Sequence, residues 1–337
     1  LGARDDIALS GYLVSARSTP APGDTRLPLP GIVASHVWAR TDLPRADRWL
    51  GHPDVVHGTN YVAPPTRRPT VVSVYDCWFL EHPDESTALV RRAGLRLRRS
   101  VARGAWVHAG AEAVAEQARH LLGTDRVVTV PLGPPDPVEP IGALAVPGLA
   151  ERLGGRPFVL ALGTHERRKD LPVLIEAFAA IAGDHTDVLL VLAGGAGDDS
   201  DAVAAAVAAL PAPVAHRVVL PGFVDDSTKA WLLRRATVLA YPSRDEGFGF
   251  PVLEAQTAGT PVVASRVGAL PEVAGDGAVL VTDRSPAGFA TALAGVLDDD
   301  QERARLVRAG TANLRRFDWQ RTADGLVGLY RTAIEAR

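Results

Sequence analysis

The chain has 337 residues, of which 47% are hydrophobic, and it carries a formal net charge of −3. This length favours two domains over one core, and the charge gives no reason to expect nucleic-acid binding, which usually shows a strongly basic domain or face. A single cysteine, Cys77, excludes an internal disulfide and fits a reducing compartment.

Targeting signals are not apparent in the sequence. No apolar run approaches the roughly 18 residues needed to span a bilayer, and no signal peptide stands at the start. We therefore expect a cytoplasmic protein. The chain begins at Leu1 and contains no methionine, so we also expect that the sequence is incomplete, with residues missing before its first one.

The first part of the chain, residues 1–145, predicts an α/β domain. Short apolar runs at 54–57, 71–74 and 127–132 are typical of buried parallel strands. Residues 88–122 are rich in Ala, Leu and Arg at helical spacing, with breaks near Gly104 and around Val107. A stretch rich in Pro and Gly, from Gly133 to about residue 155, is the best linker candidate.

After the linker, strands and helices alternate regularly. We expect strands at 158–162, 188–193, 218–221, 237–241 and 261–265, and helices at 172–181, 201–210, 227–235 and from Pro251 onward. This alternation indicates βαβ units and a parallel sheet, so residues 146–316 are predicted to form a doubly wound Rossmann-like domain. Residues 317–337 are predicted to form a final helix.

Glycines and polar residues follow four of the predicted strands, at 163–169, 194–195, 222–225 and 243–250. In open parallel sheets the ligand lies at the carboxyl ends of the strands. These segments are therefore expected to converge on one crevice.

Two carboxylates, Glu246 and Glu254, frame a Gly-rich turn in the last of these segments. Its glycines allow unusual dihedrals and a close approach to a ligand, and Pro251 suits the first turn of a helix. The amino end of such a helix is a ready site for an anion. For either glutamate alone, a solvated loop or helix-start position is the plainer alternative.

Cations gather in the segment Gly163-Thr164-His165-Glu166-Arg167-Arg168-Lys169, directly before a predicted helix. Positive charge at a helix amino end opposes the helix dipole, so a bound anion would explain this placement. A nucleoside diphosphate suits a guanidinium fork and an ammonium group. A solvated run of surface charges remains the alternative.

Residues 246–265, Glu-Gly-Phe-Gly-Phe-Pro-Val-Leu-Glu-Ala-Gln-Thr-Ala-Gly-Thr-Pro-Val-Val-Ala-Ser, closely resemble the Glu-x7-Glu signature of retaining glycosyltransferases of family 4. The resemblance covers roughly residues 54–335. It implies the α/β GT-B fold, in which two Rossmann-like doubly wound domains face a cleft and the C-terminal helix crosses back to the N-terminal domain. The stretches Gly-Thr-x-x-x-Arg-Lys and Tyr-Asp-Cys-Trp-Phe look most like mannosyl- or rhamnosyl-transferring enzymes of cell-surface polysaccharide biosynthesis.

The resemblance also implies roles for individual residues. Glu254 would bind the ribose of the nucleotide and Glu246 the transferred sugar, with Arg168 and Lys169 on the diphosphate. The catalytic candidates are Glu246, Arg168 and Lys169. The donor-binding candidates are Gly163, Thr164, Phe223, Val224, Gly247, Phe248, Gly249, Phe250 and Glu254. The acceptor-side candidates are Asn60, Tyr75 and Asp76.

Two of these assignments have open alternatives. The segment around Phe223 and Val224 resembles the family's base-binding stretch, but a strand end with a turn explains it equally well. Many family members have His where this chain has Tyr75, and a phenol with a pKa near 10 is a poor proton shuttle at neutral pH. A role in the core is the alternative for Tyr75, because its side chain is amphipathic.

The implied function is transfer of a sugar, with retention, from a nucleotide-diphospho-sugar to a glycan, lipid-linked or small-molecule acceptor. The donor base, GDP, UDP or dTDP, stays undetermined. The leaving phosphate would assist deprotonation of the acceptor, so no protein base is expected. The histidines show no metal-ligand spacing, so no metal or other cofactor is expected either. The alternatives are a non-hydrolysing nucleotide-sugar epimerase of GT-B shape and a degenerate nucleotide-sugar-binding subunit.

A run of arginines, Arg91 to Arg103, forms a basic helix in the predicted acceptor-side domain. It could contact the inner face of a membrane or a lipid phosphate as a peripheral protein does. A solvated helix face is the alternative, because a basic cluster alone is weak grounds for a partner.

Overall fold

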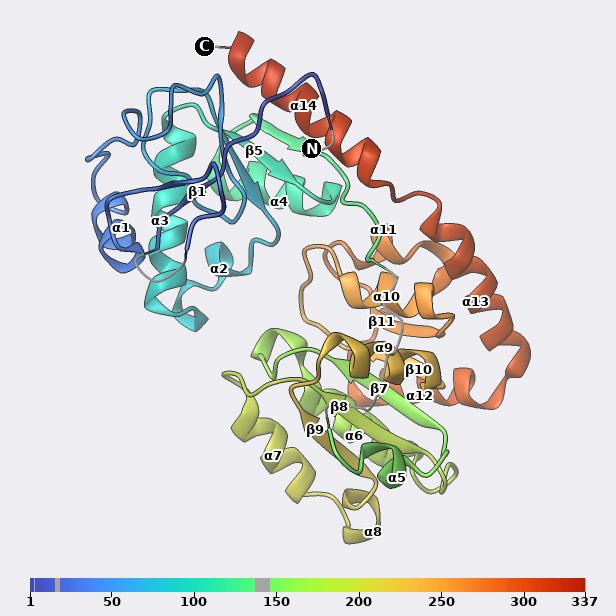
Figure 1. The fold of residues 1–337 in the computed structure, drawn as a ribbon. Coiled ribbons are helices and arrows are strands. Elements are labelled where there is room, and N and C mark those ends of the chain that lie inside the picture. Colours follow the sequence, from blue (N-terminus) through green and yellow to red (C-terminus); the bar gives the residue numbers. More distant parts are fainter. Residues whose placement is uncertain (3, 16–18, 137–145, 337) are drawn as a thin grey trace. The chain divides into compact units, whose positions relative to one another are not determined.

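A computed structural model describes residues 1–2, 4–15, 19–136 and 146–336 of the chain. They form two compact units, the first made of Leu1–Gly133 with Asp318–Arg337 and the second of Pro134–Phe317 (Figure 1). The chain therefore passes from one unit to the other twice. Residue 145, the proposed domain boundary, and the linker residues 137–145 lie outside the described part.

The first unit is built on a four-stranded parallel sheet in the order β3 (Val56–Gly58), β4 (Thr70–Val74), β5 (Trp106–Ala109) and β6 (Val127–Thr129). These strands follow chain order, so no doubly wound reversal occurs among the described strands of this unit. The helices α2 (Trp78–Glu81), α3 (Ala88–Ala102) and α4 (Glu112–Leu122) accompany the sheet. Farther toward the N-terminus lie α1 (Gly31–Trp38) and a parallel strand pair, β1 (Tyr12–Leu13) and β2 (Thr25–Arg26).

The continuous helical pattern read at 88–122 hides a strand. Gly104 takes a φ of +89°, which a side chain would oppose, and it ends the turn after α3. Val107 then lies fully buried in the centre of β5. The break noted in the sequence at these two residues is therefore a helix-strand-helix passage.

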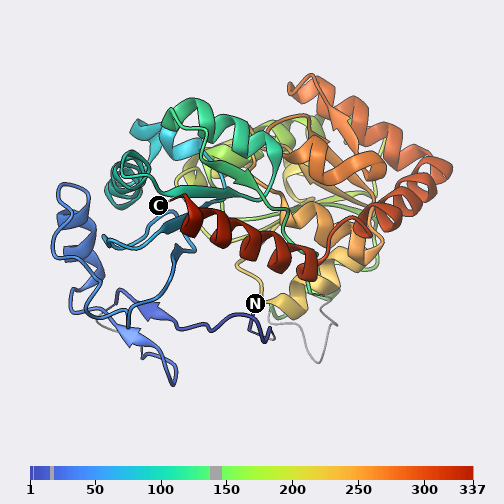
Figure 2. The same cartoon turned by 90° about the horizontal axis from the view of Figure 1, so that it is seen from above.

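The C-terminal helix α14 (Trp319–Glu335) packs on the sheet of the first unit (Figures 1 and 2). Its buried apolar side chains join Val71 and Val130 in one core cluster, and they are Leu326, Val327, Leu329, Tyr330 and Ala333. Gly325 makes the close approach possible, because a Cβ there would lie 2.6 Å from Val130 Cγ1. The helix predicted to return to the N-terminal domain is thus confirmed.

A chain of buried hydrogen bonds links α14 to the strands beneath it. His108 Nε2 lies 2.9 Å from the Val130 carbonyl oxygen, so this nitrogen must donate. His108 Nδ1 then accepts from Ser73 Oγ at 2.7 Å, and Ser73 Oγ accepts from His57 Nε2 at 2.9 Å. His57 Nδ1 is left as the acceptor for the Tyr330 hydroxyl at 2.7 Å. With both histidines neutral, this arrangement satisfies all four ring nitrogens.

The second unit holds a six-stranded parallel sheet. Its order is β12 (Val279–Val281), β11 (Val262–Ser265), β10 (Val238–Tyr241), β7 (Phe158–Leu162), β8 (Leu189–Ala193) and β9 (Val218–Gly222). The chain runs outward from β7 to β9, returns to β10 on the other side of β7, and runs outward again to β12. This reversal is the doubly wound order, and its switch point lies between β7 and β10.

Helices cover both faces of this sheet, which explains why its strands read as continuous apolar runs. Alternate residues of β7 point to opposite faces, so Val159 belongs to one core cluster and Leu160 to the other. One face is covered by α6 (Leu171–Ile181), α7 (Ser200–Ala208), α12 (Pro286–Asp298) and α13 (Asp300–Leu314). The other is covered by α5 (Leu149–Leu153), α9 (Asp226–Arg235), α10 (Phe250–Ala258) and α11 (Leu270–Ala274).

The strands and helices predicted in this unit from 158 to 265 are present within one or two residues of the predicted bounds, helix α10 included. The strand β12 and the helices α11 to α13 were not predicted. Their apolar residues are mixed with Ala, Gly and charged residues, which gives no clear period.

Candidate functional site

The switch point of the second sheet brings two loops together. One follows β7 at residues 163–170 and the other follows β10 at residues 242–249. The Arg244 amide donates to the Arg168 carbonyl at 2.7 Å, and Arg168 Nη1 donates to the Asp245 carbonyl at 2.9 Å. Main-chain contacts therefore fix the loops against each other before any ligand is considered.

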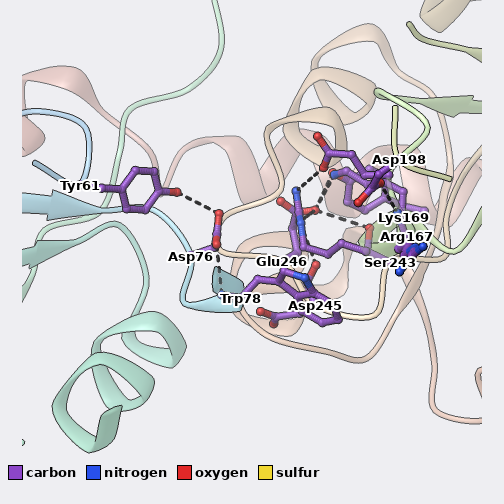
Figure 3. Close-up of polar contacts among 12 residues, drawn as sticks. Tyr61, Asp76, Trp78, Arg167, Lys169, Asp198, Ser243, Asp245 and Glu246 are labelled. Carbon is purple, nitrogen blue, oxygen red and sulfur yellow. Dashed lines mark hydrogen bonds and ion pairs between the residues drawn. The ribbon is translucent and has the colours of Figure 1, made fainter. Parts of the chain in front are cut away.

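Glu246 is the centre of the site (Figure 3). Its Oε2 accepts from Lys169 Nζ at 2.7 Å, from the Tyr241 hydroxyl at 2.8 Å and from Arg168 Nη1 at 2.9 Å. Ser243 Oγ lies 3.5 Å from the same oxygen, and Lys169 Nζ also contacts the Tyr241 hydroxyl. The side chains of Glu246, Lys169 and Arg168 are only 11%, 12% and 16% exposed. The three charges predicted as the catalytic group do meet.

Charge decides the ionisation of this cluster. Burial acts to raise the pKa of Glu246, but the neighbouring Lys169 and Arg168 outweigh it and hold the pKa below its usual value. Burial lowers the pKa of Lys169, against the opposing pull of Glu246. Burial also raises the pKa of Tyr241 well above its ordinary value. Glu246 is thus an anion held between two cations, one of which, Arg168, also lies 3.6 Å from Glu166 Oε2.

Glycines shape the turn behind Glu246. Gly249 has a φ of +89° and precedes the first residue of α10. Gly268 has a φ of +48°, and a Cβ there would lie 2.3 Å from the Glu246 carbonyl oxygen. The Phe248 ring is buried beside Phe250 and Phe317, at centroid distances of 4.9 and 5.9 Å. Phe248 therefore offers a ligand its main chain, and its ring anchors the turn.

Glu254 lies on α10 and is held by a residue that the sequence analysis did not single out. Lys229 Nζ, on α9, donates to Glu254 Oε1 at 2.9 Å and lies 3.1 Å from Asp226 Oδ1. Burial lowers the pKa of Lys229, but these two carboxylates outweigh it and raise the pKa overall. The Glu254 side chain remains 20% exposed, so its second oxygen can still accept from a ligand.

The other predicted donor-binding residues also stand at carboxyl ends of strands. Gly163 and Thr164 follow β7, and Gly163 has a φ of +134°. A Cβ on Gly194 would lie 1.8 Å from the Gly163 carbonyl oxygen, so only glycine lets the loops after β7 and β8 touch. Phe223 follows β9 with its side chain 79% exposed, and Val224 packs on the nearby core cluster. The Phe223 ring is thus free of the core.

The acceptor-side candidates follow β3 and β4 in the first unit. Asp76 Oδ2 accepts from the Tyr61 hydroxyl at 2.9 Å, and its Oδ1 accepts from the Trp78 amide at 3.2 Å (Figure 3). The Tyr75 hydroxyl donates to the Thr59 carbonyl at 2.7 Å, and burial raises the pKa of this phenol. Tyr75 is therefore a hydrogen-bond donor and a still poorer proton shuttle than a free phenol.

Some polar residues of the site were missed from the sequence. Tyr241 was predicted only as the last residue of the strand 237–241, and Ser243 was included in the segment 243–250 but given no role; their position at a strand end was the available signal. Lys229 had no such signal, because it meets Glu254 only through helix packing. Arg167, whose amide donates to Asp198 Oδ1 at 3.0 Å, contributes no side-chain contact to Glu246 in the described structure.

The basic helix predicted as a unit divides into parts. Arg96 is buried, and its Nη1 donates to Asp42 Oδ1 at 2.9 Å. Arg99 and Arg103 donate to the other oxygen of Asp42 at 3.0 and 2.8 Å. Three arginines of the run are therefore committed to one carboxylate, and Arg96 cannot face lipid or solvent.

Within the described ranges, no cluster of three or more His, Cys, Asp or Glu side chains is arranged to hold a metal ion. The same ranges contain no helix with the length and apolar character needed to cross a bilayer.

Two parallel α/β units, one of them doubly wound with a charged site at its switch point, define a protein of the GT-B class. The chain belongs to the glycosyl transferases group 1 family, whose model matches residues 150–313. The phosphatidyl-myo-inositol mannosyltransferase of Mycobacterium leprae is 33% identical over an alignment 348 residues long. The alignment covers 98% of this chain and 86% of that protein.

Other relatives agree with this placement. The D-inositol 3-phosphate glycosyltransferase of Xylanimonas cellulosilytica is 36% identical over 235 residues, which cover 66% of this chain and only 56% of that relative's length. The solved structure of sucrose-phosphate synthase from Thermosynechococcus elongatus, 18% identical, covers 97% of this chain and 89% of its own with a TM-score of 0.71. This likeness confirms the predicted fold. The epimerase and binding-subunit alternatives are not favoured by these relatives.

Proposed function

We propose that the chain is a retaining glycosyltransferase that moves a sugar from a nucleotide-diphospho-sugar to an acceptor. One observation carries the proposal: at the switch point, one buried carboxylate, Glu246, is held between two cations, Lys169 and Arg168. A departing diphosphate gains negative charge, and preorganised cations in a partly dry site stabilise that charge well. No bound metal is required in this scheme, because the two side chains supply the positive charge.

Different residues bind different parts of the donor. Lys169 and Arg168 bind the diphosphate, and the amides of residues 247–250 at the start of α10 bind phosphate and sugar oxygens. Glu246 accepts from hydroxyls of the transferred sugar. Glu254, oriented by Lys229, accepts from the ribose hydroxyls, while the loop 222–224 meets the base and the loop 163–164 borders the phosphates.

The chemistry follows from the ionisation of Glu246. Because Lys169 and Arg168 lower its pKa, this carboxylate is a weak base and serves to hold the sugar. The bond from the anomeric carbon to the phosphate oxygen breaks, and the acceptor oxygen bonds to the same face of that carbon. The acceptor proton passes to the leaving phosphate, which makes a protein base unnecessary.

The acceptor would be handled by the first unit, through Asn60, Tyr75 and Asp76. The relatives act on an inositol phosphate and a phosphatidyl-inositol by name, which favours a glycan or lipid-linked acceptor with an anionic group and a mannosyl-type transfer in cell-surface biosynthesis.

We also propose peripheral contact with an inner membrane face through exposed residues of α3. Leu89 and Leu95 are 56% and 53% exposed there, and Arg91 and Arg98 are exposed beside them. Apolar side chains flanked by arginines are typical of helices that lie in a membrane interface. Flotation with anionic vesicles tests this, and unchanged binding of a Leu89→Glu, Leu95→Glu variant would refute it.

A thermal-shift screen of GDP-, UDP- and dTDP-sugars, followed by a transfer assay on the hits, tests the function. A donor that stabilises the protein in proportion to the logarithm of its concentration identifies the nucleotide. Transfer with retained anomeric configuration supports the proposal. Release of an isomerised sugar without acceptor, or binding with neither hydrolysis nor transfer, would contradict it.

A further inference from the structure

The first unit carries a cavity of about 480 Å³ at the amino edge of its sheet. Thr70 opens β4 there, Ala105 precedes β5 and Arg126 precedes β6. The acceptor-side candidates follow the carboxyl ends of β3 and β4, at the opposite edge of the same sheet. The cavity is therefore separate from them.

Arginines dominate the lining, and among the described residues no acidic side chain joins them. The five are Arg67, Arg68, Arg96, Arg103 and Arg126. Two carboxylates lie close to these arginines: Asp47 accepts from the Arg67 amide, and Asp42 pairs with Arg96 and Arg103 but also with Arg99. Asp42 thus faces three guanidinium groups.

The remaining lining arginines have neutral partners or none. Arg126 Nη1 donates to the Gly104 carbonyl at 2.7 Å, and Arg68 Nη2 lies 3.1 Å from His52 Nδ1. In the described part of the chain the Arg67 side chain has neither an ion pair nor a hydrogen bond. Like charges gathered in one hollow repel each other, and a bound anion would relieve that repulsion.

The loop that carries two of these arginines is ordered in advance. Asp47 accepts from Thr66 Oγ1 at 2.7 Å and from the Arg67 amide at 2.8 Å, and the Arg68 amide donates to Thr66 Oγ1 at 3.0 Å. Pro69 follows and fixes the entry to β4. The loop would lose little entropy on binding a ligand.

The helix dipole explains only part of the cluster. Arg99 lies in the last turn of α3 and Arg103 directly follows the helix, and cations are favoured at this end in any case. Arg67, Arg68 and Arg126 lie outside helices, so this cause does not apply to them.

We propose that this cavity binds a phosphate-bearing anion of about diphosphate size, at a site distinct from the donor diphosphate. Guanidinium forks match phosphate oxygens in geometry and charge. A free phosphorylated compound and a lipid phosphate headgroup share this chemistry. The inference does not depend on the proposed transferase reaction, because it uses none of its residues.

Titration calorimetry with inorganic pyrophosphate tests the site in full-length protein. All forms carry Lys169→Ala, so that the donor site contributes little. The test variant adds Arg67→Gln and Arg126→Gln, and the matched control adds Arg315→Gln, an exposed arginine of the second unit. Thermal unfolding without pyrophosphate checks each fold. Arg67→Gln alone serves where the double variant is unstable, because its side chain makes no contact to lose.

The test variant should bind pyrophosphate about tenfold or more weakly, since it loses charge-assisted hydrogen bonds, and the control should bind as the parent does. Equal affinity in all forms would overturn the proposal. Cosedimentation with phosphatidylglycerol vesicles then separates the sources. A parallel loss of vesicle binding identifies a lipid headgroup, and unchanged vesicle binding alongside weaker pyrophosphate binding identifies a free anion.

Discussion

Acid should loosen the first unit through its buried histidine pair. His57 and His108 are both neutral in the hydrogen-bond chain from Tyr330 to Val130, and a second proton on either ring would place a positive charge in a largely buried site. Burial lowers the pKa of His57 to about 4, and burial lowers the pKa of His108 as well.

The sign and size follow from linkage. An unfolded histidine binds its proton near pH 6.5, whereas folded His57 binds it only near pH 4. The unfolded state therefore takes up protons first, and stability is lost as pH falls from 6.5 toward 4. His57 alone should cost about 2 kcal/mol at pH 5, which is about a 30-fold change in the opening equilibrium. His108 adds a loss in the same direction.

Hydrogen exchange read by mass spectrometry measures this locally, which matters because a chain of two units need not unfold in one step. Protection of the β4 and α14 amides, corrected for intrinsic rates, should fall about 20-fold between pH 7 and pH 5 through His57 alone. The matched variant is His57→Gln, whose amide can donate to Ser73 but does not titrate in this range. If wild type and His57→Gln lose protection in parallel, the histidine is not the cause and the reasoning fails.

Three further predictions concern the second unit. Lys169→Ala should lower kcat about 100- to 1,000-fold, because the transition state loses one preorganised charge. Circular dichroism checks the fold of the variant. Full activity would remove Lys169 from the mechanism. Glu254→Ala should weaken nucleotide binding about tenfold in calorimetry, while the exposed Glu176→Ala, on α6, should not, and equal effects would reject the ribose assignment. Gly268→Ala should cost about 1–3 kcal/mol in urea unfolding, because its φ is +48° and a Cβ would strike the Glu246 carbonyl; a neutral result would mean that the turn relaxes freely.

Residues close to strand ends were predictable from the sequence. The apolar runs of the second unit are long enough to fix its strands, and topology then forces the loops after β7 and β10 together. This expectation and the family resemblance together assigned Lys169 and Glu246, 77 residues apart, to one site. The Gly-rich turn added the position of α10, since Gly249 and Pro251 both mark a helix start.

Contacts made by helix packing were not predictable in the same way. Lys229 reaches Glu254 from another helix, and nothing in either segment encodes that meeting. The arginine run looks uniform in the sequence, yet its members differ in burial. The buried Arg96 donates to Asp42, which lies 54 residues earlier in the chain. Side-chain pairing of this kind depends on rotation and depth of each helix, which a periodic pattern does not specify.

The chain is synthesised from its N-terminus, so the position of α14 at the C-terminal end delays completion of the first unit. All of the second unit, residues 134–317, leaves the ribosome before the helix that completes the first unit. Until residues 326–333 appear, Val71 and Val130 lack their apolar cover and His57 lacks the Tyr330 hydroxyl. The first unit is thus begun first and finished last, and a nascent chain whose first 317 residues have emerged from the ribosome would hold one complete unit and one with an open core.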